Sequence, residues 1–465
     1  MTAPPDDGTA LAARVRAGEI RATSVVSQAL AAIEAGDGEI NSFTSVLADR
    51  AHAEASRVDA LVADGHDPGP LAGVPYAVKN LFDVAGEVTL AGSRINATLP
   101  PATADAPTIT RLREAGAVLL GSLNMDEYAY GFTTENTHYG PCHNPHDHAR
   151  VAGGSSGGSG AAVAAGFVPL TMGSDTNGSV RVPASLCGVY GLKPTYGRIT
   201  RRGMFPFCPS FDHVGILGRS VRDLAAAFDV LHGYDPGDPA TTSRSPEPTV
   251  PELDRGIDGL RLAVADGYFA RGGAPEALAV VSQLAEALGV TETVTIAQAA
   301  RARSAAMVIT ASEGAQLHLH DLRHRAGDFD PMTRDRFLAG ALVPASAYLG
   351  AQRFRRWFAA EVRRALGATD VLLAPATPFP APLIGQREAV VDGETVLTQP
   401  YLGCYTQPLS FVGLPVVTVP IVAPGGLPLG VQLVAAPYRE AVLLRVAAEL
   451  ERRGLCRAAV VGPWS

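Results

Sequence analysis

Lysine is rare in this chain and therefore informative. Of the 38 basic residues, only Lys79 and Lys193 are lysines. A lysine can lose its proton and act as a base, whereas an arginine side chain stays charged. Lys79 lies in the apolar segment LAGVPYAVKNLFD, where burial disfavours the charged form. Lys79 is thus a candidate base, and we expect Lys193, in GVYGLKPTYGR, to be structural.

Two glycine- and serine-rich loops could supply a nucleophile. They are GGSSGGSG (153–160) and GSDTNGS (173–179). In the second loop Ser179 follows Asn177 and Gly178, and backbone N–H groups there can converge on one point. Converging donors are what a tetrahedral oxyanion needs. This pattern favours acyl transfer with a serine nucleophile.

A serine nucleophile needs a base, and the sequence offers two. One is Lys79. The other is His213, with Asp212 beside it. Adjacent residues on a strand point to opposite faces, so Asp212 could not easily orient His213. Lys79 is therefore the favoured base.

Other uses of the glycine-rich loops fit the sequence less well. A phosphate-binding loop is disfavoured because no lysine follows the glycines at Walker spacing. No later acidic residue completes a dinucleotide pattern. A flexible linker is disfavoured because apolar segments flank the loop closely on both sides.

Cysteine and histidine usage gives no sign of a disulfide framework or a metal centre. The cysteines are odd in number, widely spaced and without C-x-x-C, so we expect a reduced, cytoplasmic chain. Two histidine-rich stretches lack a recognised ligand spacing, so no metal is expected. The residues concerned are Cys142, Cys187, Cys208, Cys404 and Cys456, then His143, His146 and His148, and finally His318, His320 and His324.

Composition excludes several classes of protein. The chain has 465 residues, 47% of them hydrophobic and 18% charged, and a net charge of −8 without a basic block. Direct nucleic-acid binding through phosphate contacts is thereby disfavoured. No run of 18 apolar residues and no secretory signal appears, so neither a membrane span nor export is expected. A chain of this length can bury a large core without the help of disulfides or a structural metal.

The candidate residues must be positioned by alternating strands and helices. The first 60 or so residues predict helices, 71–84 predicts a strand entering a loop, and 106–125 predicts a helix, a glycine turn and a short strand. Further strands are predicted within 261–269, 369–378 and 413–421, and further helices at 273–289 and 340–366. The proline-rich segment 233–253 is predicted to be a surface connection. This alternation indicates an α/β fold with a largely buried sheet.

Three motifs together resemble the amidase signature family of serine hydrolases. They are GVPYAVKN around Lys79, the GGSSGGSG loop, and GSDTNGSVRVPAS. The resemblance covers nearly the whole chain. It implies an amidase signature fold, with a mixed, mostly buried sheet covered by helices on both faces. We expect an N-terminal helical segment at 1–60 and one large domain at 61–465.

The family resemblance also implies roles for single residues. Lys79 matches the lysine, Ser155 the bridging serine and Ser179 the nucleophile of a Ser–cisSer–Lys triad, in which the bridging serine follows a cis peptide bond. The oxyanion hole maps to Thr176, Asn177, Gly178 and Ser179. Supporting positions are Ser156, Asp175 and Arg181, with a structural role favoured for Arg181.

Longer segments bear on the substrate. Segments 124–147, 173–198 and 308–340 resemble family members that release ammonia from a small carboxylated urea, 1-carboxybiuret. Such a substrate implies a cation for its carboxylate, for which Arg336 is the preferred match and Arg334 and Arg323 are rivals.

Two further side chains are expected to line the substrate pocket. Asn177 stands where many members have glycine, so it is expected to narrow the pocket and add an amide donor. Tyr128 is the other expected lining residue.

Alternative functions remain open at this stage. The chain could be the glutamine-hydrolysing component of a tRNA-dependent amidotransferase, a general amidase, or a non-catalytic scaffold on the same fold. Intact Lys79, Ser155 and Ser179 argue against the scaffold. The resemblance implies no cofactor, and it implies a small helical partner subunit within a homo- or hetero-oligomer.

Overall fold

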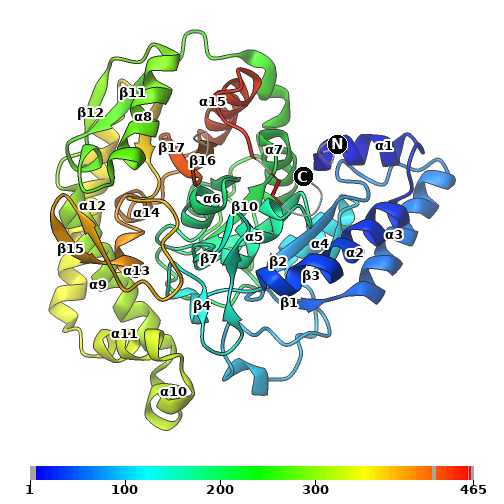
Figure 1. Ribbon diagram of the computed structural model, residues 1–465, viewed down its shortest axis with the longest axis horizontal. Coiled ribbons are helices and arrows are strands. Elements are labelled where there is room, and N and C mark those ends of the chain that lie inside the picture. The colour runs from blue at the N-terminus through cyan, green and yellow to red at the C-terminus, as the bar shows by residue number, and fades with distance from the viewer. Residues whose placement is uncertain (1–6, 422–425, 459, 462–465) are drawn as a thin grey trace.

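A mixed sheet of eleven strands organises the computed structural model, which describes residues 7–421, 426–458 and 460–461 (Figure 1). Strand β2 lies parallel to both β3 and β8, whereas β10 runs antiparallel to β8. From edge to edge the order is β1 (Phe43–Val46), β3 (Val118–Leu123), β2 (Pro75–Lys79), β8 (Leu170–Asp175), β10 (His213–Gly218), β9 (Tyr190–Lys193), β16 (Val416–Ile421), β17 (Leu429–Val434), β13 (Val371–Pro375), β11 (Leu262–Asp266) and β12 (Thr293–Thr295).

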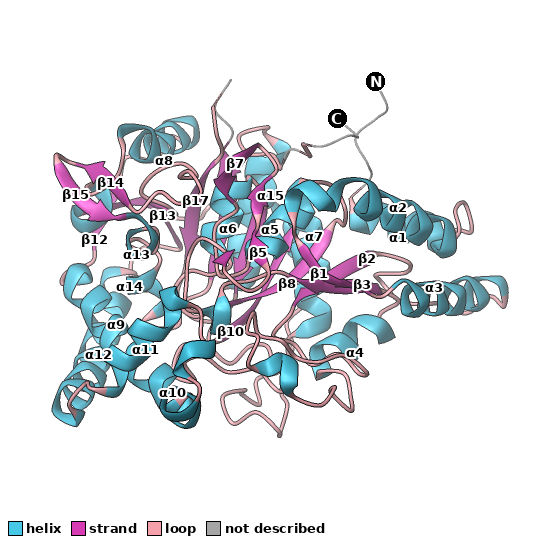
Figure 2. Cartoon of the chain, turned by 60° about the horizontal axis from the view of Figure 1, so that its bottom comes forward, coloured by secondary structure: helices cyan, strands magenta, loops and turns pink. Residues whose placement is uncertain are grey.

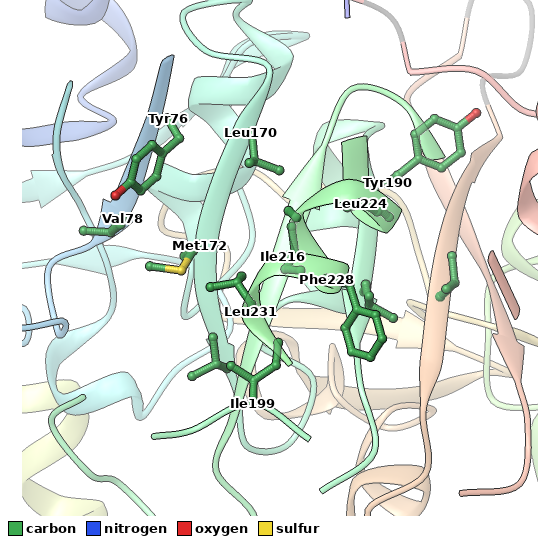
Figure 3. Packing of buried hydrophobic residues seen from close by; sticks show 14 of the residues in the cluster. Tyr76, Val78, Leu170, Met172, Tyr190, Ile199, Ile216, Leu224, Phe228 and Leu231 are labelled. Carbon is green, nitrogen blue, oxygen red and sulfur yellow. The ribbon is translucent and has the colours of Figure 1, made fainter. Parts of the chain in front are cut away.

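Helices cover both faces of this sheet (Figure 2). Successive residues of a strand point to opposite faces, so Tyr76 and Val78 join one apolar cluster while Ala77 joins another. Figure 3 shows part of the first cluster: Tyr76, Val78, Met172 and Ile216 come from the sheet, and Leu224, Phe228 and Leu231 come from a covering helix. That face is covered by α4 (Pro107–Glu114), α7 (Val221–Leu231), α8 (Pro275–Leu288) and α15 (Glu440–Arg452), and the other by α2 (Ala22–Ile40), α3 (Ala48–Ala63), α5 (Gly157–Ala164) and α6 (Arg181–Cys187). The predicted α/β class with a buried mixed sheet is confirmed.

A helical layer beyond the sheet contributes to the site described below. Helix α9 (Ala299–Leu317) packs against α11 (Pro331–Ala341), α12 (Ala345–Ala365) and α14 (Gln407–Ser410) (Figure 1). Asp330 starts α11 with a favourable cap, since its side chain accepts a hydrogen bond from Met332 N. The remaining elements are short: α10 (Leu319–His324), α13 (Thr398–Tyr401), β4 (Glu135–Asn136), β5 (Gly140–Pro141), β6 (His143–Asn144), β7 (Asp147–Val151), β14 (Glu388–Val391) and β15 (Glu394–Leu397).

Most predicted elements occur where they were expected. Segment 71–84 contains β2, segment 106–125 contains α4 and β3, and 340–366 contains α12. The proline-rich segment 233–253 runs through turns into a short 3-10 helix, Val250–Arg255.

The N-terminal region differs from its prediction in one respect. Helices α1 (Gly8–Arg16), α2 and α3 are present, but Phe43–Val46 between α2 and α3 forms the edge strand β1. This strand pairs antiparallel with β3 and so extends the main sheet. Four residues between two helices carry too little periodic pattern to reveal such a strand. The division of the chain at residue 60 stays a prediction.

No helix in the described ranges combines the length and the apolar character needed to cross a membrane.

Candidate active site

The ends of two neighbouring strands bring the candidate residues together. Lys79 is the last residue of β2 and Asp175 the last residue of β8, and these strands are parallel neighbours. The carboxyl ends of parallel strands meet at one edge of a sheet, where sites in α/β proteins commonly form. The serine loops lead from this edge into helices, since Ser155 precedes α5 and Ser179 precedes α6.

Lys79 is completely buried and in direct contact with Ser155. Its Nζ lies 2.7 Å from Ser155 Oγ and 2.9 Å from Ser174 Oγ. Burial lowers the pKa of Lys79 to about 7, although the negative charges of Asp126, Asp175 and Asp212 oppose the shift. A neutral amine is therefore accessible near neutral pH, as a general base requires.

The two serine loops are joined through Ser156. The Gly154–Ser155 peptide bond is cis, as the family resemblance implies. Ser156 N donates to the carbonyl oxygen of Ser179 at 3.3 Å, and Ser156 Oγ lies 3.2 Å from Ser174 O. A side chain at Gly154 would be impossible, because its Cβ would lie 2.1 Å from Asp126 Oδ2. The structure thus places Ser155, the residue bound to Lys79, immediately before a residue bound to Ser179.

A buried ion pair closes the loop around Ser179. Arg181 is 0% exposed and forms two hydrogen bonds of 2.9 Å with the carboxylate of Asp175. Burial alone would raise the pKa of Asp175, but the charge and hydrogen bonds of Arg181 hold it well below its usual value. Arg181 also donates to Thr406 O and Ser410 Oγ. This geometry favours the supporting role expected for Arg181.

Hydrogen bonds from two other parts of the chain fix residues 176–180, which lie between Asp175 and Arg181. Thr176 Oγ1 donates to Asp212 Oδ1 at 2.6 Å, and Thr406 Oγ1 donates to Asn177 O at 2.6 Å. Gly178 has a φ of +140°, and a Cβ there would lie 2.2 Å from Thr406 Oγ1, so only glycine fits. The backbone expected to stabilise the oxyanion is therefore fixed before substrate arrives.

The alternative base, His213, does not form the pair with Asp212 that a catalytic histidine would need. His213 Nδ1 lies 2.5 Å from Phe211 O, and its Nε2 lies 3.2 Å from Lys193 Nζ. Asp212 is engaged with Thr176 instead. Lys193 Nζ donates to the carbonyls of Pro194 and Leu414, which supports the structural role expected for this lysine.

Arg336 is the best placed of the three candidate carboxylate ligands. It donates to Tyr130 O at 3.0 Å and to Gln399 Oε1, and its guanidinium stacks on the Tyr130 ring at 5.5 Å. The positive charge of Arg336 acts to lower the pKa of Asp126, whose backbone N–H donates to Ser155 O. The rivals face elsewhere, because Arg323 is exposed and Arg334 pairs with its neighbour Asp335.

Tyr128 and Asn177 differ from their expectations. Tyr128 is only 2% exposed, its ring packs among Phe205 and Phe329, and its hydroxyl donates to Asn96. A left-handed turn at Tyr128 and Ala129 directs this ring into the core. Tyr130, two residues later, is the tyrosine that contacts Arg336. The side chain of Asn177 is present in the loop as expected, but it is not a free donor.

Sequence reasoning overlooked several residues of the site. Ser174 is the second partner of Lys79, and Gln399 orients Arg336. Asp126 lies behind Gly154, and burial raises the pKa of its carboxyl to about 7. Thr310, on α9, accepts the Asn177 Nδ2–H bond at 2.9 Å. Asp126 stands in the motif NMDEYAYG, but Thr310 and Gln399 are too distant in sequence for spacing to reveal them.

Potential metal ligands do not gather in the described part of the chain: no three His, Cys, Asp or Glu side chains form a group that could hold a metal ion. The five cysteines are free and buried. His146 and His143 bond backbone carbonyls of Cys187 and His148.

A buried, deprotonatable lysine that is hydrogen-bonded to one serine, near a second serine in a glycine loop, is the arrangement that serine–lysine hydrolysis requires. The amidase family model matches residues 24–444, and the chain belongs to the amidase family. It is an amidase-type hydrolase.

Within that family the chain is similar to two kinds of enzyme. It is 54% identical over 446 residues to AtzE, the 1-carboxybiuret hydrolase protein of Pseudomonas sp. (strain ADP), with 95% of this chain and 97% of the relative covered. It is 38% identical to one component of the glutamyl-tRNA(Gln) amidotransferase of Anaeromyxobacter dehalogenans (strain 2CP-C), with 95% and 94% covered. A solved, inhibitor-bound complex of an s-triazine catabolic enzyme superposes with a TM-score of 0.96 at 53% identity, covering 97% of this chain and 100% of that one.

Proposed function

We propose that this chain releases ammonia from 1-carboxybiuret, or from a closely related carboxylated urea, by Ser–cisSer–Lys catalysis. The observation that supports the mechanism is the direct hydrogen bond between buried Lys79 and Ser155, next to the loop that carries Ser179. The substrate is supported by the 54% identity to AtzE and by the position of Arg336.

The first half of the reaction forms an acyl-enzyme. Neutral Lys79 takes the proton of Ser155, which takes the proton of Ser179, so that Ser179 Oγ bonds to the terminal amide carbon of the substrate. The resulting oxyanion is stabilised by backbone N–H groups of residues 176–179. The proton then returns through Ser155 to the leaving nitrogen, the C–N bond breaks, and ammonia departs.

The second half regenerates the enzyme. Water gives its proton to the same relay and attacks the acyl carbon, and the bond to Ser179 Oγ breaks as that oxygen is reprotonated. Because Lys79 is neutral at the start of both acylation and deacylation, the same amine acts as the base in each step.

The carboxylate of the substrate is assigned to Arg336. A guanidinium offers a planar fork of donors that matches a carboxylate. The hydrogen bonds of this fork go to the neutral acceptors Tyr130 O and Gln399 Oε1. Asp126 and Asp330 act on the guanidinium through charge, without a direct ion pair.

The experiment is a comparison of ammonia release from fresh 1-carboxybiuret, biuret, allophanate, glutamine and an aliphatic amide, with Ser179→Ala as the blank. We expect the highest kcat/KM for 1-carboxybiuret. Best turnover of glutamine, particularly with charged tRNA and partner subunits, would show the amidotransferase function instead. Turnover restricted to aliphatic or aryl amides would show a general amidase.

The protein is also proposed to act in a hetero-oligomer with a small helical subunit. The support is that its similar solved neighbour is a protein complex. We further propose a cytoplasmic location, in keeping with the free cysteines.

A further inference from the structure

The side-chain oxygen of Asn177 is a buried acceptor without a hydrogen-bond partner among the described residues. Asn177 is 8% exposed and lies two residues before Ser179 in the same loop. A buried amide oxygen without a partner is unfavourable. Two residues along a chain span about 7 Å, so Oδ1 and the attacking hydroxyl can contact the same small substrate.

Thr310, the hydrogen-bond partner of Asn177, lies beside a network of hydrogen bonds centred on Glu313. The Glu313 carboxylate accepts from Ser210 N at 2.9 Å, from Ser210 Oγ at 2.5 Å, from Tyr348 Oη at 2.9 Å and from Cys208 Sγ at 3.2 Å. A carboxylate can only accept hydrogen bonds, so the thiol of Cys208 must be the donor in its bond to Glu313.

The Asn177 amide meets this network at Thr310, on α9. The Thr310 hydroxyl lies close enough to the Cys208 thiol to act on its pKa, in the lowering direction, although burial of the thiol raises that pKa overall. Thr310 Oγ1 accepts a hydrogen bond from Asn177 Nδ2 at 2.9 Å. One N–H of the Asn177 amide is thus engaged, and Oδ1 is the buried acceptor that has no partner among the described residues.

We propose that Asn177 Oδ1 accepts a hydrogen bond from an N–H group attached to the scissile carbonyl on its acyl side, and that Glu313, Cys208 and Thr310 are positioning residues that hold this orientation. A ureide, R–NH–CO–NH₂, carries such an N–H. A carboxamide such as glutamine carries a CH₂ there and leaves the acceptor unpaired. The site therefore selects N-carbamoyl compounds, a specificity that rests on the proposed amidohydrolase function.

The test uses pairs of substrates that differ only by NH against CH₂ at this position. Biuret is compared with malonamide, and N-carbamoylglycine with succinamate, by kcat/KM for ammonia release. Intrinsic reactivity cancels when the ureide-to-amide ratio of a variant is divided by that of the wild type. We expect Asn177→Ala and Asn177→Gly to lower this ratio about tenfold or more, since a buried polar group is no longer matched to the substrate.

Two results separate the inference from the proposed function. If the wild type hydrolyses biuret and the ratio is unchanged in Asn177→Ala, the inference is overturned and the proposed function stands. If the wild type hydrolyses malonamide but neither ureide, the proposed function is overturned and the inference with it.

The positioning residues are tested with matched variants. Thr310→Val removes the acceptor of the Asn177 N–H, and Cys208→Ala removes the thiol beside Thr310, so both are expected to lower the ratio. Thr310→Ser keeps the hydroxyl and Cys208→Ser replaces the thiol with a hydroxyl donor, so both are expected to retain a ratio near that of the wild type. Cys456→Ala is the control for loss of a buried thiol, since Cys456 contacts Tyr190 and is not part of the network of hydrogen bonds. Wild-type ratios in both Thr310→Val and Cys208→Ala would overturn the positioning roles. Should either variant fail to fold in a thermal melt, the Asn177 and serine variants decide.

Discussion

Lys79 combines full burial with two hydroxyl partners, an environment that allows an amine to exchange its proton near pH 7. An arginine at this position would stay protonated and could not accept the proton of Ser155. We expect Lys79→Arg and Lys79→Ala to fold and to lose kcat by several orders of magnitude. Lys193→Arg, at the other lysine, is expected to retain much of the activity. Near-normal turnover of Lys79→Arg in a steady-state assay would contradict the base role.

The lowered pKa of Lys79 predicts a pH profile with a definite sign. Below about pH 7 the amine is protonated and cannot act as a base, so kcat/KM should fall about tenfold per pH unit. Above about pH 7 the neutral form dominates, and kcat/KM should level off. The profile of kcat/KM reports the free enzyme and is the measurement to use. A rising limb centred near pH 10 instead would show that the lysine behaves as it does in water.

Arg336 gives a prediction that separates binding from chemistry. Loss of a charged hydrogen-bonding group costs about 1.5–3 kcal/mol, so Arg336→Met should lower kcat/KM for a carboxylated urea about 10- to 150-fold, mainly through KM. Biuret, which lacks the carboxylate, should change little. Arg334→Met is the matched control, because Arg334 pairs with Asp335. Equal losses for both substrates would place Arg336 in a structural role.

At the scale of elements, the loop between β8 and α6 depends on the Asp175–Arg181 pair. Both side chains are 0% exposed, and removing one partner would leave a buried charge unpaired. We expect Arg181→Met to lower the free energy of unfolding by about 3–5 kcal/mol. Arg364→Met removes a surface pair with Glu361 that solvent screens, and it should change the free energy of unfolding far less. Urea unfolding of the two variants and the wild type measures the difference. A loss no larger in Arg181→Met than in Arg364→Met would contradict the stabilising role of the buried pair.

The contacts between elements also explain why α9 and α11 belong to the site. Helix α9 supplies Thr310 and α11 supplies Arg336, although both lie far beyond Ser179 in the sequence. Glu127 ties α11 to the loop before Tyr130, because its carboxylate accepts from Asp330 N at 2.8 Å and from the Thr333 hydroxyl. In the proposed function, the residues assigned to the substrate therefore lie on helices, while those assigned to catalysis lie at or just after strand ends.

At the scale of the whole molecule, the proposed small subunit predicts a dependence on coexpression. The chain expressed alone should be poorly soluble or unstable, and a short neighbouring reading frame encoding a helical protein should rescue it. Size-exclusion chromatography with light scattering would then show a complex larger than the 48.2 kDa chain. A fully active, well-behaved protein purified alone would argue against the partner.

Local sequence determined much of this molecule. The alternation of apolar strands with amphipathic helices predicted the α/β class, because side-chain periodicity is set by the local backbone geometry. The isolated lysine and the two glycine–serine loops predicted a lysine base for a Ser179 nucleophile, because a lysine, unlike an arginine, can lose its proton and a glycine loop can present converging N–H groups. The family resemblance, rather than the pattern, implied the Lys79–Ser155 contact that the structure contains. Strand β1 was not predicted, because it exists through its pairing with β3 rather than through a pattern of its own.

Tertiary structure decided what surrounds those residues. Whether Tyr128 or Tyr130 meets Arg336 depends on a left-handed turn at Tyr128 and Ala129 that composition does not reveal. Whether Asn177 presents an N–H or an oxygen depends on Thr310, 133 positions away. Hydrogen-bond direction and side-chain burial are set by partners that only folding brings within about 3 Å of one another. The sequence by itself therefore determined the catalytic chemistry, and the folded chain determined the shape and polarity of the site for its substrate.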